Sequence, residues 1–369
     1  MLVLKQPTDE AAELDRRILA FMRTPQTSEA HFERLALDLF LYQYRHNQPY
    51  RQFCDQRGRT PASVINWQHI PAVAAASFGD ARLASFSPER SQLWFESSGT
   101  TSGGSRASRH ELETTQLYDA SLALQFRRCV MPDRERMPMY LFSPSFLEAP
   151  HSSLAYMLAN IFEQYGAGGG FCIHEGALDY DWSIAELKQA SEPVLVFGTT
   201  FALVHFIDHC RERGVRFQLP QQSRLVETGG FKGRSRSLER VEFYAMLGEF
   251  FGLPRSYCLS EYGMCELGSQ WYDGNLADQL AGRTPRLDVK IGPHWARHLI
   301  VDEVTAEPMH GTVGLLQLFD LSNRGSVAAV LSADLARDEN EGFVFMGRAP
   351  GAPPKGCSIT ADALLSKNA

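Results

Sequence analysis

Short apolar segments of strand length alternate with longer amphipathic segments through the middle of this chain, and this alternation constrains the fold most. The apolar segments predict strands at residues 139–142, 194–197 and 225–227. The segments between and after them predict helices at residues 152–165, 201–213 and 237–251. Because strands that alternate with helices usually pair in parallel through crossovers, the pattern predicts an α/β fold with a largely parallel sheet.

The two ends of the chain differ from this middle part. Residues 9–57 are predicted to be helical, because apolar side chains recur there at helical spacing after a candidate cap at Ser28. Residues 111–130 also read as a helix, with an acidic first turn. After residue 290 only short strands are expected, which indicates a small antiparallel sheet or barrel. We therefore predict an N-terminal helical segment (1–60), an α/β core (61–290), a small β-rich subdomain (291–346) and a short C-terminal tail (347–369).

Composition and charge exclude several classes of function. The chain has 369 residues, of which 44% are hydrophobic and 21% charged, as in an ordinary globular protein. Its formal net charge of -7 argues against a nucleic-acid partner and against an anionic membrane surface. No apolar run reaches the roughly 18 residues of a membrane span, and the first residues lack the pattern of a signal peptide. The seven cysteines are scattered and fit no zinc site, so we expect free thiols in a cytoplasmic protein.

One polar segment is a candidate binding loop. Every residue from 97 to 105 is Ser, Thr or Gly, and the segment ends close to Arg106, Arg109 and His110. Glycines let backbone N–H groups approach a ligand, hydroxyls add donors, and the basic side chains would add positive charge. This combination suits a polyphosphate, although the sequence is neither a P-loop nor a G-x-G-x-x-G motif. A polar loop without a ligand is the alternative interpretation.

Three further motifs follow this loop in a fixed order. They are Thr228-Gly229-Gly230-Phe231-Lys232-Gly233, Glu261-Tyr262-Gly263-Met264-Cys265-Glu266, and Ser332-Ala333-Asp334-Leu335 with Gly347-Arg348. The ordered set resembles the adenylate-forming superfamily, which includes acyl-CoA synthetases and firefly-type luciferases. Within it the chain is most similar to the acyl-protein synthetases of bacterial bioluminescence (LuxE type, long-chain-fatty-acid luciferin-component ligases). Further residues that carry this similarity are Ser108-Arg109-His110, the segment 152–157, and Gly356-Cys357-Ser358.

The resemblance implies a fold and a set of nucleotide-binding residues. The fold is that of the superfamily's N-terminal domain, with parallel sheet layers flanked by helices and a small β-rich subdomain, while the large C-terminal domain is absent or vestigial. The β- and γ-phosphates of ATP would be held by Ser97, Ser98, Gly99, Thr100, Thr101 and Gly103. The adenine would be lined by Gly229, Gly230, Tyr262 and Gly263, and the ribose held by Asp334, with Arg348 on the ribose or the α-phosphate. Glu266 matches the superfamily's Mg²⁺-binding Glu, and carboxylate oxygen suits that hard cation.

Two lysines that are usual in the superfamily are missing here. One follows the phosphate loop, and the other stabilises adenylation from the C-terminal domain of larger members. Arg109, His110 and Lys232 are the catalytic candidates in their place, with Lys232 or Arg109 neutralising the α-phosphate in the transition state. Solvated basic side chains without a role are the alternative, just as Asp334 and Glu266 could be turn or surface residues.

The last candidate is Cys357, twelve residues from the end of the chain. The acyl-protein synthetases carry the acyl group on a cysteine in this region. A thiol is a strong nucleophile at neutral pH, and the nearby Lys355 would favour its thiolate form. The alternative is an ordinary cysteine without a catalytic role.

Together these residues predict an ATP-dependent acid–thiol ligase. A carboxylic acid, in this family a fatty acid, would be converted to acyl-AMP with release of pyrophosphate. The acyl group would then pass to Cys357 and on to a partner protein, such as a fatty-acyl reductase. One alternative is an acyl- or aryl-CoA or carrier-protein ligase with the same first step, and the other is a nucleotide-binding protein without ligase activity.

Overall fold

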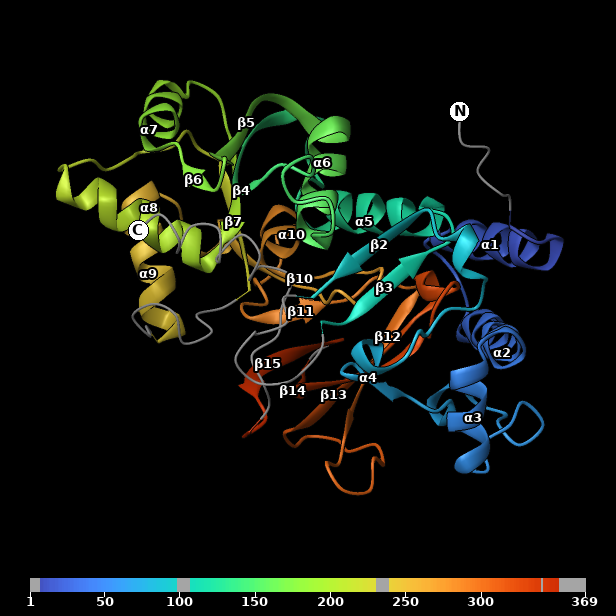
Figure 1. Ribbon diagram of the computed structural model, residues 1–369. Coiled ribbons are helices and arrows are strands. Elements are labelled where there is room, and N and C mark those ends of the chain that lie inside the picture. The colour runs from blue at the N-terminus through green and yellow to red at the C-terminus, as the bar shows by residue number, and fades with distance from the viewer. Residues whose placement is uncertain (1–6, 98–106, 230–238, 340, 352–369) are drawn as a thin grey trace. The chain divides into compact units, whose positions relative to one another are not determined.

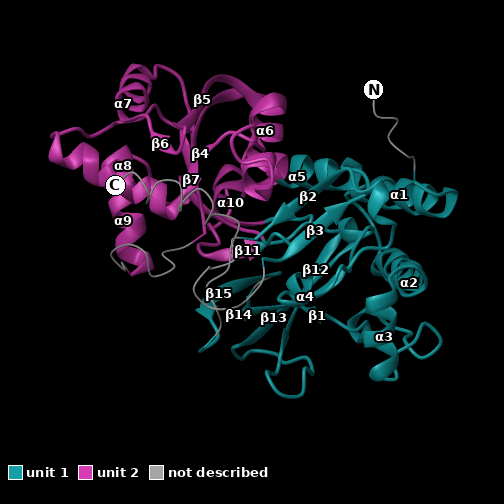
Figure 2. Ribbon diagram, viewed as in Figure 1, with its two compact units in different colours: residues 1–125, 264–270, 291–355 teal, residues 126–263, 271–290, 356–369 magenta. Residues whose placement is uncertain are grey.

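The computed structural model describes residues 7–97, 107–229, 239–339 and 341–351 (Figure 1). The chain divides into two compact units, each assembled from separate stretches of sequence (Figure 2). Unit 1 comprises residues 1–125, 264–270 and 291–355, and unit 2 comprises residues 126–263, 271–290 and 356–369. The four-part division predicted from the sequence stays a prediction. Both units depend on contacts between residues that are far apart along the chain.

The core of unit 2 is a mainly parallel sheet. Its described strands are β4 (Met137–Pro144), β5 (Gly166–His174), β6 (Ala177–Leu178), β7 (Leu195–Thr199), β8 (Arg224–Thr228), β9 (Cys258–Tyr262), β10 (Trp271–Asp273) and β11 (Val289–Ile291). Neighbours in the order β5-β4-β7-β8-β9 pair in parallel. Antiparallel strands follow on either side, β6 beside β5 and β10 beside β9. The parallel sheet predicted from the sequence is therefore confirmed.

Helices α6 (Ser153–Tyr165), α7 (Tyr180–Gln189), α8 (Thr200–Glu212) and α9 (Arg240–Phe251) lie in the connections between the parallel strands of unit 2. The short α10 (Asn275–Leu280) follows β10. Hydroxyl side chains cap two of them: Ser152 accepts from the N–H of Ala155, and Thr199 accepts from the N–H of Ala202. The last turn of α9 ends at Gly252, whose φ of 70° lies in the left-handed region that glycine adopts without strain. Because α6 follows β4 and α8 follows β7, both N-termini lie at the carboxyl edge of the parallel strands.

Unit 1 begins with a group of helices. They are α1 (Asp9–Met22), α2 (Glu29–His46), α3 (Gln48–Gln56) and the short α4 (Ser77–Asp80), with 3-10 turns η1 (Trp67–His69) and η2 (Pro88–Arg90). The helical character predicted for residues 9–57 is confirmed. No helix within the described ranges combines the length and apolar character needed to cross a membrane.

The helix predicted over residues 111–130 is wrong at its start. Arg109–Leu112 form strand β3, which pairs antiparallel with β2 (Leu93–Glu96), and α5 (Gln116–Cys129) begins only after it. The carboxylate of Glu111 is bound by arginine side chains in this hairpin. The acidic residues therefore stabilise the hairpin rather than the first turn of a helix.

An antiparallel sheet completes unit 1. Strands β12 (Ala296–Val301), β13 (Gly314–Asp320), β14 (Ala329–Glu339) and β15 (Gly342–Arg348) pair in chain order, and β1 (Val73–Ala74) pairs in parallel with β14. The 3-10 turn η4 (Leu321–Asn323) connects β13 to the segment that leads into β14. This arrangement confirms the antiparallel strands predicted after residue 290.

Candidate active site

The predicted phosphate loop starts from a closed hairpin base. Ser97 is buried, its N–H donates to the carbonyl of Ser108 (3.0 Å), and its Oγ accepts from the N–H of Ser108 (2.9 Å). Ser108 Oγ donates to the carbonyl of Ala75 (3.2 Å), which fixes this base to the rest of unit 1. The other predicted loop residues lie outside the described ranges: Ser98, Gly99, Thr100, Thr101 and Gly103.

Arg109 is half-exposed and forms an ion pair next to this base. Its Nε lies 3.2 Å from Glu111 Oε1, and its guanidinium lies over the ring of Trp94, 4.5 Å from the centroid. Glu111 Oε2 also accepts from Arg82 Nε (3.0 Å) and Nη2 (2.8 Å). Two guanidinium groups thus share the carboxylate of Glu111, while Glu96, paired in register with Arg109, adds a second negative charge to the hairpin.

His110 points into unit 1 and is buried. Its Nδ1 lies 2.9 Å from the carbonyl oxygen of Cys265, and its Nε2 lies 3.0 Å from Ser326 Oγ. Because a carbonyl oxygen only accepts, Nδ1 carries the hydrogen and Nε2 accepts from the serine. Burial lowers the pKa of His110 to about 4, since the charged ring would lose its hydration. The expectation that His110 adds positive charge is therefore wrong, because its ring is neutral at pH 7.

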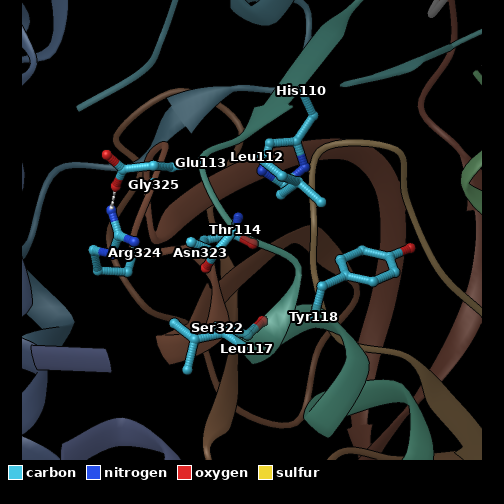
Figure 3. A pocket seen from close by; sticks show the side chains of 10 residues that line it. All are labelled: His110, Leu112, Glu113, Thr114, Leu117, Tyr118, Ser322, Asn323, Arg324 and Gly325. Atoms are coloured by element: carbon cyan, nitrogen blue, oxygen red, sulfur yellow. Dashed lines mark hydrogen bonds and ion pairs between the residues drawn. The ribbon is translucent and has the colours of Figure 1, made fainter. Parts of the chain in front are cut away.

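Glu266 is buried in a short segment, Met264–Gln270, which belongs to unit 1 and follows β9 of unit 2 along the chain. Its backbone carbonyl accepts from Asn323 Nδ2 (2.8 Å). Figure 3 shows that His110, Ser322 and Asn323 surround one small cavity. Within the described ranges no three acidic, His or Cys side chains come together as a metal site. One carboxylate completed by substrate phosphates is a common arrangement for Mg²⁺, and Glu266 fits this arrangement.

The structure brings together the two residues that the resemblance assigns to the ribose and α-phosphate. Asp334 on β14 and Arg348 on β15 are directly opposed in the strand register. Arg348 Nε lies 3.6 Å from Asp334 Oδ1; Asp334 is buried and Arg348 is partly exposed. Ser332 Oγ accepts from the N–H of Asp334 (3.1 Å), which fixes the backbone at this position.

In unit 2 the predicted adenine-binding residues lie at the carboxyl edge of two neighbouring parallel strands. Thr228 and Glu261 are paired in register, and Thr228 Oγ1 donates to the Glu261 carboxylate. Gly229 follows with a φ of 93°, in the region that favours glycine. Tyr262 and Gly263 follow Glu261, so the two predicted motifs meet at one edge of the sheet. Gly230 and Lys232 lie outside the described ranges.

Sequence reasoning missed several buried polar residues beside these motifs. Glu227 on β8 accepts from Thr200 Oγ1 (2.5 Å) and from the hydroxyl of Tyr244 (2.9 Å), which joins β8 to α8 and α9. In unit 1 the missed residues are Asn323 and Ser326. The sequence signal for Glu227 is a charged residue in an apolar strand, and that for Asn323 and Ser326 is a polar turn between apolar strands. Neither signal shows which residues these side chains bind.

The thiols in the described ranges are protected from reaction. The six cysteines there are all buried, namely Cys54, Cys129, Cys172, Cys210, Cys258 and Cys265. Burial raises the pKa of Cys54, Cys172 and Cys258 to about 12, because a thiolate would lose its hydration. The predicted acyl acceptor, Cys357, lies outside the described ranges.

Comparisons with known proteins agree with these motifs. A family model described as acyl-protein synthetase, LuxE, matches residues 6–361. The long-chain-fatty-acid–luciferin-component ligase of Aliivibrio fischeri is 21% identical over 374 residues, which cover 95% of this chain and 94% of that protein. The ligase of the same name from Vibrio harveyi is 23% identical over 380 residues, which cover 97% and 96%.

A solved structure shows the fold. An open conformation of 2-hydroxyisobutyryl-CoA ligase, in complex with 2-HIB-AMP and CoA, superposes with a TM-score of 0.63 at 12% identity. The match covers 94% of this chain and 80% of that one. The mixed sheet with flanking helices is therefore the fold of the adenylate-forming ligases.

Proposed function

This chain belongs to the acyl-protein synthetase family, and from that membership we propose that it activates a fatty acid as acyl-adenylate and passes the acyl group to a cysteine thiol. In the first step a carboxylate oxygen attacks the α-phosphorus of ATP and pyrophosphate leaves. In the second step a thiolate attacks the acyl carbonyl carbon and AMP leaves. Activation is required because a carboxylate has no adequate leaving group for direct attack by a thiol.

The observation that carries the proposal is the opposed pair of Asp334 and Arg348. A carboxylate can accept from both ribose hydroxyls, while a guanidinium can donate to the ribose or the α-phosphate. Their ion pair holds both side chains at neighbouring positions on rigid strands. For adenine we propose Gly229, Gly230, Tyr262 and Gly263, since a tyrosine ring stacks on a base and glycines permit close approach.

The triphosphate requires hydrogen-bond donors and positive charge. We assign the donors to residues Ser97, Ser98, Gly99, Thr100, Thr101 and Gly103. The ordered base at Ser97 and Ser108 supports this role, because a loop with fixed ends loses less entropy on binding. Glu266 would hold Mg²⁺, which neutralises phosphate charge when bound.

Two basic residues are candidates to neutralise the α-phosphate as it is attacked. Arg109 is supported by its place next to Ser108, which closes the base of the phosphate loop with Ser97, and by Arg82, which shares the carboxylate of Glu111. Lys232 is supported by its motif alone. Removing the residue that acts in the transition state should lower the rate of acyl-AMP formation by about tenfold or more. Comparing Lys232→Ala with Arg109→Ala in ATP–pyrophosphate exchange decides between them, and unchanged exchange in both variants would exclude both assignments.

The described thiols support Cys357 as the acyl acceptor, because the other six cysteines are buried. A buried thiol is both inaccessible and reluctant to ionise. From Cys357 the acyl group would pass to a partner protein, such as a fatty-acyl reductase. The alternative acceptor is CoA or a carrier protein.

Two measurements on the same sample test the proposal. Acid-dependent ATP–pyrophosphate exchange with Mg²⁺ and a panel of carboxylic acids reports adenylation, and the intact mass reports the acyl-protein. We expect wild type to show both, Cys357→Ala to retain exchange without the mass adduct, and the buried-thiol control Cys210→Ala to behave as wild type. No acid-dependent exchange in wild type would overturn adenylation. An adduct that persists in Cys357→Ala would overturn the acceptor, and CoA thioester formed by that variant at the full rate would favour a CoA ligase.

A further inference from the structure

The segment Met264–Gln270 carries Glu266 but forms no helix or strand of its own. We call it the Glu266 segment. Its backbone cannot be fixed by a ladder of hydrogen bonds within one element, so its position depends on side chains from elsewhere in unit 1. Buried backbone groups need such partners, and the structure supplies them on both sides of Glu266.

Asn323, at the end of η4, binds this segment at two points. Its Nδ2 donates to the carbonyl of Glu266 (2.8 Å), and its Oδ1 accepts from the N–H of Gly268 (2.8 Å). The remaining Nδ2 hydrogen is directed to the carbonyl of Val327 (3.0 Å). Asn323 is 2% exposed, so these hydrogen bonds are shielded from bulk solvent. The side-chain amide of Asn323 thus connects the backbone of Glu266 to that of Gly268.

His110 binds the segment on the other side of Glu266. Its Nδ1 donates to the carbonyl of Cys265 (2.9 Å), while Ser326 Oγ donates to Nε2 (3.0 Å). The serine therefore fixes both the tautomer and the plane of the ring. The carbonyl of Cys265 is thus bound by His110, and the carbonyl of Glu266 by Asn323. These two side chains come from different parts of unit 1.

The rest of the segment packs too closely against η4 to shift. A Cβ added to Gly268 would lie 2.4 Å from Ser322 Oγ and 3.4 Å from Asn323 Oδ1. Ser269 Oγ donates to the buried Asp320 Oδ1 (2.8 Å), which also accepts from Ser322 Oγ (2.6 Å). The backbone is consequently fixed from residue 265 to residue 269.

We propose that Asn323 and His110 are positioning residues for Glu266 and thereby set the affinity of the protein for a divalent cation bound with nucleotide. The inference rests on the proposed function, in which Glu266 is the cation ligand. Groups that orient a metal ligand typically change metal affinity or activity by about 10–100-fold when they are removed. Neither residue needs to touch substrate for this effect.

The test measures cation binding apart from turnover. Mn²⁺ serves as the probe, with a non-hydrolysable ATP analogue, and free Mn²⁺ is followed by electron paramagnetic resonance. We expect Asn323→Ala to raise the Mn²⁺ Kd by about tenfold and to raise the Mg²⁺ concentration for half-maximal exchange in parallel, with little change in the KM for the acid. Gln125→Ala is the matched control, because Gln125 is equally buried and donates to the carbonyl of Ile291 (2.8 Å). That variant should lose thermal stability without a change in Mn²⁺ affinity.

A second variant of His110 distinguishes the loss of its hydrogen bond to Cys265 from misfolding. His110→Asn places an amide donor at the position of Nδ1, facing the Cys265 carbonyl, so its Mn²⁺ Kd should lie between those of wild type and His110→Ala. Unchanged Mn²⁺ affinity in folded Asn323→Ala and His110→Ala would overturn the positioning role. If Mn²⁺ affinity falls in both variants but wild type shows no acid-dependent exchange, the result would contradict the proposed function and still support the positioning role.

Discussion

At the scale of single residues, the opposed pair on β14 and β15 gives the nucleotide assignment a direct test. We expect Asp334→Asn to raise the KM for ATP by about tenfold, because hydrogen bonds to a charged acceptor contribute about 1.5–3 kcal/mol. The ATP dependence of ATP–pyrophosphate exchange measures this change. Asp338→Asn is the control, since Asp338 lies on the same strand and pairs with His298 (3.0 Å). The same increase in both variants would contradict a specific role for Asp334.

The buried ring of His110 makes stability depend on pH. Its pKa in the folded protein is about 4, below the usual 6.5, so the unfolded chain takes up a proton first as the pH falls. The stabilisation linked to the neutral ring is therefore present above pH 6.5 and is lost between pH 6.5 and 4, by up to about 3 kcal/mol. We expect the difference in unfolding free energy between wild type and His110→Gln to shrink as the pH falls. Urea titrations at pH 7, 5.5 and 4.5 measure it, and a constant difference would contradict this linkage.

At the scale of elements, the contact between the Glu266 segment and η4 leaves no room for a side chain at Gly268. Gly268→Ala should cost about 1–3 kcal/mol, because its Cβ would overlap Ser322 Oγ. Ser322→Ala removes that oxygen and leaves the Ser322 Cβ at 3.2 Å. The double variant should therefore be more stable than the sum of the single changes predicts. Thermal or urea unfolding of the four proteins measures the coupling, and strict additivity would mean that the two positions do not collide.

The same elements show what the sequence could and could not predict. The periodicity of residues 139–251 predicted β4, β7 and β8 and the helices α6, α8 and α9, because that pattern is local, whereas β5, which begins in a glycine-rich segment, and α7 were not predicted. The strand at Arg109–Leu112 was missed, because its one acidic residue, Glu111, is bound by Arg82, which lies 29 residues earlier in the sequence. Asn323 was missed for a similar reason: its partners, Glu266 and Gly268, are more than fifty residues away in the chain. Local patterns carry no information on such partners.

At the scale of the whole molecule, the chain builds unit 1 mainly from two stretches that are far apart in the sequence, residues 1–125 and 291–355. Arg324, after η4, donates through Nε and Nη2 to both carboxylate oxygens of Asp15 on α1, each at 2.7 Å. Its Nη1 donates to the carboxylate of Glu113, which precedes α5 (Figure 3). Glu113 also pairs with Arg90 (2.6 Å). The side chains of Arg324, Asp15 and Glu113 are all almost fully buried. One guanidinium thus joins segments separated by as many as 309 residues.

Removing this guanidinium should destabilise the protein in a pH-dependent way. Arg324→Met is expected to cost about 3–5 kcal/mol at pH 7, because it leaves buried carboxylates without their cation. Burial already raises the pKa of Asp15, and Arg324 opposes that rise. Without Arg324 the pKa of Asp15 in the folded protein rises further, so the folded variant binds a proton more readily than the unfolded chain. Its stability deficit should therefore be largest near pH 8 and decrease toward pH 5.

Urea unfolding of wild type and Arg324→Met across this pH range measures the deficit. Arg216→Met is the control, since the pair of Arg216 and Glu249 is exposed and contributes less than about 1 kcal/mol. A deficit that stays constant with pH would mean that the buried carboxylates find other partners. A deficit that grows with pH would show that Arg324 holds α1 and the segment before α5 in unit 1 by charge, because the proton that relieves the deficit binds a carboxylate, Asp15 or Glu113, that has lost this cation.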